Sequence, residues 1–102
     1  MRDLKFTVSG QKLKMVGDAS GVIAGTKGYL RCVFDFKDQD WPRCRKIAVF
    51  GDDEPVLVAG NACWVPDAVT DGRTIKVQLI GRMGSTSIIT NPVYIVQEVT
   101  GK

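Results

Sequence analysis

The chain has 102 residues, of which 44% are hydrophobic and 25% are charged, and its formal net charge is +3. This length and this ordinary composition predict one globular domain over residues 1–102 that can bury a single core without disulfides or metal ions to hold it together. The mild charge argues against a nucleic-acid partner, because dedicated nucleic-acid binders usually gather more positive charge on one face. No apolar run of about 18 residues occurs, so no membrane span is expected.

The N-terminal stretch MRDLKFTVSG lacks the apolar segment and cleavage site of a signal peptide, so we expect the chain to be made in a cytoplasm and not sent through a secretion channel. The three cysteines are an odd number at wide spacing, which indicates no disulfide framework. Cys32 and Cys63 lie in apolar stretches and are expected in the core. Cys44, within RCRK, is the cysteine expected to be an exposed thiol.

Alternation of apolar and polar residues with a period of two dominates the chain and predicts β-strands. In chain order the expected strands are 4–8, 12–16, 29–36, 45–50, 54–59, 61–65, 74–82, 87–90 and 93–99. Residues 17–28 are irregular and predict a loop or a short strand at 21–24, and residues 66–72 predict one helical turn at most. Short connections argue against parallel crossovers, so a sandwich or barrel of antiparallel sheets is predicted.

One face of each expected strand should form the core. The predicted core residues are Leu30, Cys32, Phe34, Ile47, Val49, Val56, Val58, Cys63, Val65, Ile75, Val77, Leu79, Ile88, Tyr94 and Val96.

The sequence offers little catalytic equipment. It contains no histidine, which removes Ser–His and Cys–His catalytic pairs and the commonest metal ligand. The cysteines form no C-x-x-C pair, so neither a metal nor any other cofactor is expected. Two aspartate-rich segments, 35–40 and 52–54, could supply a hydrolase with a carboxylate pair or hold calcium. Aspartates that simply form turns are the favoured interpretation of both segments, and no enzyme activity is predicted.

Candidate binding residues are aromatic and basic. Trp41 precedes Pro42 in a turn, and Trp64 should point outward if its neighbours Cys63 and Val65 point inward. A carbohydrate-binding site would use Trp64, Trp41 and Tyr29 as outward aromatics, with Arg43 and Arg45 for anionic groups. The alternative interpretations are that Trp64 packs under the 17–28 loop and that the arginines are a solvated strand end.

The second half of the chain also resembles a known family. A tryptophan lies ahead of a strand ending in Val-Phe (Trp41, then Lys46–Phe50), and a Cys-x-Val-Pro step follows at 63–66. A hairpin then carries the residues Val77, Leu79, Gly81, Gly84, Ile88, Thr90 and Asn91. This pattern, over residues 41–97, resembles the immunoglobulin-like β-sandwich modules of tail, baseplate and fibre proteins from phages of Gram-positive bacteria.

The resemblance implies an all-β fold, an immunoglobulin-like antiparallel β-sandwich of about 7–9 short strands. It also implies a non-enzymatic structural or assembly protein of a phage or prophage virion, made in the host cytoplasm. Its expected partners are other virion proteins and further copies of itself, because an oligomer covers open sheet edges. The alternative function is a carbohydrate-binding module that recognises host-surface polysaccharide.

Overall fold

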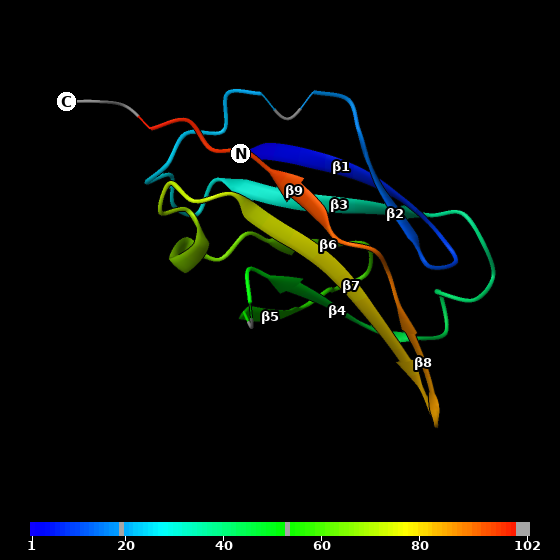
Figure 1. Cartoon of the computed structure of the whole chain (residues 1–102). Coiled ribbons are helices and arrows are strands. Elements are labelled where there is room, and N and C mark those ends of the chain that lie inside the picture. The colour runs from blue at the N-terminus through cyan, green and yellow to red at the C-terminus, as the bar shows by residue number, and fades with distance from the viewer. Residues whose placement is uncertain (19, 53, 100–102) are drawn as a thin grey trace.

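The computed structural model of the chain describes residues 1–18, 20–52 and 54–99, apart from the side chain of Glu54. Within these ranges nine strands and one short 3-10 helix follow one another (Figure 1). They are β1 (Arg2–Ser9), β2 (Lys12–Val16), β3 (Leu30–Phe36), β4 (Arg45–Phe50), β5 (Glu54–Leu57), β6 (Ala62–Trp64), η1 (Asp67–Val69), β7 (Ile75–Met83), β8 (Thr86–Ile89) and β9 (Val93–Ile95). The strands form two packed sheets, so the predicted all-β sandwich is confirmed, as is the single helical turn.

The first sheet has the strand order β2-β1-β3-β6. β1 and β2 form an antiparallel hairpin that turns at Gly10, whose φ of 57° suits glycine. β1 and β3, in contrast, pair in parallel, with Phe6 beside Phe34. The prediction of purely antiparallel sheets is therefore wrong at this pair. The 20 residues between these strands, 10–29, include β2 and give the chain enough length to return to the same end of the sheet.

The second sheet has the order β5-β4-β7-β8, and β9 also pairs with β7. β7 is the longest strand, and β8 and β9 lie one after the other along the same side of it. The β7–β8 ribbon extends past the other strands at one end of the molecule, as the yellow and orange arrows of Figure 1 show. All residues from Arg82 to Ser87 are exposed there, so the hairpin is a projecting arm.

The core lies between the sheets and confirms most of the prediction. The predicted core residues that are buried are Leu30, Cys32, Phe34, Val58, Cys63, Val65, Ile75, Val77 and Leu79, while Val56 and Ile88 pack against the core from partly buried positions. Four predictions are wrong. In β4, Ala48 and Phe50 point inward, so Ile47 and Val49 face outward. Around β9, Ile95 is buried, so Tyr94 and Val96 are exposed.

These four errors have a common cause, which is a shift of one residue in strands that are apolar on both faces. The side-chain period of a strand is two, so choosing the wrong parity reverses the inward and outward faces. The irregular 17–28 segment also contributes to the core through Val22. It forms a single parallel bridge from Ile23 to Glu98 in place of the short strand considered above.

The two sheets are joined along both sides. On one side the side chain of Asn91 imitates a strand partner: its Oδ1 accepts from the Leu13 N–H at 2.8 Å, and its Nδ2 donates to the Leu13 carbonyl at 3.0 Å. On the other side the predicted Gly60-Asn61 turn leads the chain from β5 in the second sheet to β6 in the first, through an Ala59–Ala62 bridge.

Candidate interaction surface

The outer face of the second sheet carries an unbroken apolar row. Strand register places Leu57 beside Ile47, Ile47 beside Ile80, and Ile80 beside Ile89, so the row crosses β5, β4, β7 and β8. Leu57 is 57% exposed and Ile89 is 49% exposed, while the two central isoleucines are half-buried by their neighbours. We call these four residues the apolar row. A contiguous apolar feature on a sheet face is typical of an interaction site.

The apolar row is bordered by contrasting neighbours. On the side toward the projecting hairpin, Arg45 and Arg82 lie directly opposite each other on β4 and β7. Within the described residues neither arginine has an ion-pair partner. On the other side Val49 lies between Pro55 and Gln78. Like charges directly opposite each other destabilise a sheet, so the arginine pair is suited to contact with carboxylates.

The predicted site residues do not come together. Trp41 is fully buried and donates from Nε1 to the Gly10 carbonyl at 2.8 Å, so the prediction of an outward aromatic there is wrong. Gly81 creates the slot for this ring, because a Cβ at Gly81 would lie 2.7 Å from Trp41 Cζ3.

The expectation that Cys44 is an exposed thiol is also wrong. It is buried, and its Sγ donates to the Asp40 carbonyl at 3.3 Å.

The basic residues are dispersed as well. Arg45 belongs to the arginine pair beside the apolar row, whereas Arg43 lines an open hollow between the β3–β4 connection and the β7–β8 hairpin. Lys46 lies over the Phe36 ring, with its Nζ 5.4 Å from the ring centroid. The sequence therefore predicts positive charge in this region, but the fold distributes it over separate surfaces.

Trp64 and Tyr29 are exposed and belong to the first sheet's side of the molecule, so of the two interpretations of Trp64 the outward one holds. Trp64, 50% exposed, lies directly opposite Arg31 across the β3–β6 pair. The Arg31 guanidinium donates to both carboxylate oxygens of Asp3, at 3.0 Å each. This hydrogen-bonded ion pair lowers the pKa of Asp3 and raises that of Arg31. The result is a guanidinium held in place beside an exposed indole.

A shallow hollow of about 500 Å³ lies at the end of the second sheet, between the turn after β4 and the segment after η1. Asp52, Asp71, Arg73, Lys76 and Tyr94 contribute to its lining. In this hollow the carboxylate of Asp71 accepts a hydrogen bond from the guanidinium of Arg73, and this contact lowers the pKa of Asp71. Opposite charges are thus interspersed, and the hollow has no single electrostatic character.

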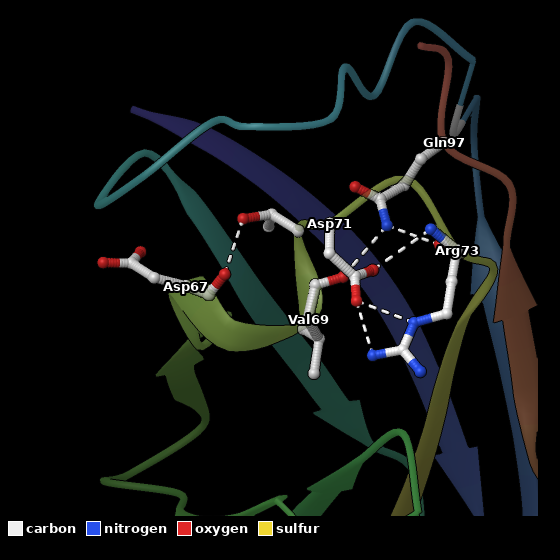
Figure 2. Close-up of polar contacts among 6 residues, drawn as sticks. Asp67, Val69, Asp71, Arg73 and Gln97 are labelled. Carbon is white, nitrogen blue, oxygen red and sulfur yellow. Dashed lines mark hydrogen bonds and ion pairs between the residues drawn. The ribbon is translucent and has the colours of Figure 1, made fainter.

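Gln97 fastens the C-terminal segment near this hollow. Figure 2 shows its side chain lying between Val69 and Arg73, with Nε2 donating to both backbone carbonyls. Its Oε1 is buried and has no hydrogen-bond partner in the part of the chain that the structure describes. The two bonds hold the segment after η1 against the residues that follow β9, so Gln97 has a structural role.

The aspartate-rich segments are used for local structure. Asp38 accepts from the backbone N–H groups of Gly10 and Asp40, and Asp35 pairs with Lys37 at 2.6 Å. Asp53 lies outside the described residues. Among the residues that are described, no three His, Cys, Asp or Glu side chains gather closely enough to hold a metal ion. The turn-forming interpretation of Asp38 is thereby supported by its contacts.

The apolar row was not predicted as a site. The available signal was that 47–49, 56–58 and 79–80 are apolar at consecutive positions, which leaves large aliphatic side chains on both faces of a strand. Sequence alone does not align four strands, so the row became visible only through the register.

A scan against protein-family models, a search of curated proteins and a search of solved structures found no match to this chain. Over the residues that the structure describes, no helix has the length and apolar character needed to cross a bilayer.

Proposed function

We propose that this chain is a non-enzymatic structural or assembly module of a phage or prophage virion, with an immunoglobulin-like sandwich that serves in the tail, the baseplate or a fibre. The resemblance of residues 41–97 to such modules supports this proposal. The structural observation that carries it is the apolar row, Leu57–Ile47–Ile80–Ile89, which lies across four strands of an outer sheet face. Burying half-exposed aliphatic side chains of this size is a usual driving force for subunit association.

The proposed occupant of this face is a second copy of the chain. β4 begins at Arg45, beside Arg82, two positions before the apolar row. A neighbouring copy turned end for end would let the two apolar rows meet while the arginine pairs of the two copies lie at opposite ends of the contact. Repetition of one contact by symmetry would cover every copy's apolar row at once.

Absolute mass from light scattering, measured over a wide range of protein concentration, tests the proposal. Because a contact in which two copies of the same row meet end for end is isologous, we expect a dimer, or a hexamer in which a second interface joins three such dimers with the three-fold symmetry of phage tails. The double variant Leu57→Ser/Ile89→Ser should shift the mass toward the monomer. Val16→Ser is the matched control, because Val16 is 47% exposed on the outer face of the first sheet and lies outside the row. A monomer at every concentration, or an oligomer that the double variant leaves intact, contradicts the proposal.

A second candidate function is recognition of host-wall carbohydrate. The observation that favours it is the exposed indole of Trp64 beside the guanidinium of Arg31, which Asp3 holds in place. Indole faces stack on sugar rings, and a fixed guanidinium suits an anionic substituent.

Tryptophan fluorescence distinguishes this function from the first. Trp64 is exposed and Trp41 is buried, so aqueous iodide should quench only the emission of Trp64. Binding of a carbohydrate should therefore change only this quenchable part of the fluorescence. An anionic wall polysaccharide from Gram-positive bacteria should protect Trp64 from iodide, and Trp64→Phe should abolish the response. An unprotected Trp64 at saturating polysaccharide would exclude this function.

A further inference from the structure

Cys32 and Cys63 lie directly opposite each other on the antiparallel strands β3 and β6. The register is defined on both sides of the pair, by a bond from Phe34 N–H to the Asn61 carbonyl at 2.8 Å and one from Val65 N–H to the Leu30 carbonyl at 3.0 Å. Both cysteines are free thiols and both point into the core. Opposed residues in an antiparallel pair have Cα atoms about 4.5–5.5 Å apart, which is within the span of a disulfide.

The two thiols have different acid–base properties. Hydrogen bonding between them lowers the pKa of Cys63, whereas the same contact and burial raise the pKa of Cys32. Cys63 therefore ionises first, and Cys32 keeps its proton. A thiolate next to a protonated thiol is the usual arrangement of an attacking and a resolving cysteine. The third cysteine, Cys44, lies on the β3–β4 connection and contacts the Asp40 carbonyl instead.

The position of β6 gives a small reagent a route to this pair. β6 has only three residues and forms the edge of its sheet, with β3 as its partner. Short edge strands open locally at a lower free-energy cost than central ones. Both cysteines are buried, but Cys63 lies on the edge strand itself and keeps 5% of its surface exposed, whereas Cys32, on the inner strand β3, keeps none. Cys63 is thus the first sulfur that an oxidant entering from this edge would meet.

We propose that Cys32 and Cys63 form an oxidation site at which a peroxide converts the two thiols into a cross-strand disulfide. The Cys63 thiolate attacks hydrogen peroxide, forming a sulfenic acid and releasing hydroxide. The Cys32 thiol then attacks the sulfenic sulfur, the S–S bond forms, and water leaves. Two electrons pass from the pair of thiols to one peroxide. The product fastens the edge strand β6 to β3 directly beneath the neighbouring pair of Trp64 and Arg31.

This cross-link would hold the Trp64–Arg31 surface rigid, because each of these residues adjoins one of the linked cysteines. If the chain is a virion component, as proposed above, the thiols remain reduced during assembly in the cytoplasm and oxidise after release. The chemistry itself does not depend on that function, so the following test on the isolated protein can fail or succeed independently of it.

The test exposes fully reduced protein to hydrogen peroxide and analyses it by mass spectrometry. Intact mass should fall by about 2 Da, for the loss of two hydrogens. Trypsin separates the three cysteines, since it places Cys32 in peptide 32–37, Cys44 in 44–45 and Cys63 in 47–73. Without reductant, peptides 32–37 and 47–73 should be linked, and dithiothreitol should release them. The oxidised protein should unfold at a midpoint roughly 10–30 °C higher than the reduced protein.

Variants locate the reaction. Cys44→Ser keeps a hydroxyl that can donate to Asp40, and it should leave the cross-link unchanged. In Cys32→Ala, Cys63 should stop at the sulfenic acid and be trapped by dimedone, whereas Cys63→Ala should give neither product. If an alanine variant fails to fold, alkylation of the wild-type thiols under denaturing conditions decides the question. Three alkylated cysteines after peroxide treatment, or a link that includes Cys44, would overturn the proposal.

Discussion

Replacing Gly81 with alanine should destabilise the fold through a contact made about 40 residues away in sequence. The added methyl would lie 3.0 Å from Cε3 of Trp41 and 2.7 Å from its Cζ3, and the shorter of these distances is closer than real Cβ atoms approach other groups. The ring must retreat by about 0.7 Å to reach the 3.4 Å at which ordinary contact begins. It has little freedom to do so, because it is fully buried, bonded to Gly10 and packed 5.4 Å from the Phe36 centroid.

Overpacking of this kind costs about 1–3 kcal/mol, and the lower chain entropy of unfolded alanine offsets roughly 0.5–1 kcal/mol of it. The middle of these ranges gives a net loss of about 1 kcal/mol in the free energy of unfolding and a decrease of roughly 4–8 °C in the melting temperature. Urea unfolding measures the first quantity and calorimetry the second. Gly81 is the glycine to test, since its φ is not in the left-handed range and alanine adds no backbone strain.

A double-mutant cycle isolates the contact. Trp41→Leu removes the far ring carbons, so Gly81→Ala should cost at least 1 kcal/mol less in that background than in the wild type. An equal cost of Gly81→Ala in both backgrounds would refute the argument that the glycine exists to admit the indole.

Three further expectations concern other contacts. Arg45→Glu should place opposite charges across β4 and β7 beside Arg82 and raise the free energy of unfolding by about 0.2–1 kcal/mol at low salt, and a decrease would show that the arginines do not repel each other. Asn91→Ala removes two hydrogen bonds from the edge of β2 and should cost about 1–3 kcal/mol, with faster amide exchange at that edge as the local readout. The pKa of Asp3 is lowered from 3.8, so its ion pair with Arg31 contributes fully above about pH 4 and is lost as the pH falls through the lowered value. Asp3→Asn should accordingly flatten the acid limb of stability against pH, and an unchanged limb would exclude this contribution.

Much of the sandwich follows from local sequence. Period-two alternation predicts where strands occur, because each strand here must present one apolar face to the opposite sheet. It also assigns the correct inward face in β3, with Leu30, Cys32 and Phe34, and in most of β7. The Gly60-Asn61 turn and the single helical turn near Pro66 are likewise predictable, since they depend on the local backbone preferences of turn residues.

The remaining features depend on contacts between distant segments. In β4 both faces are apolar, so only packing against the opposite sheet decides that Ala48 and Phe50 point inward. Trp41 is buried because β7, far along the chain, lacks a side chain at Gly81. The apolar row depends on the register of four strands, and the Cys32–Cys63 pair on that of two. Local pattern thus determines which segments become strands, whereas their alignment, a property of the whole chain, determines which side chains meet.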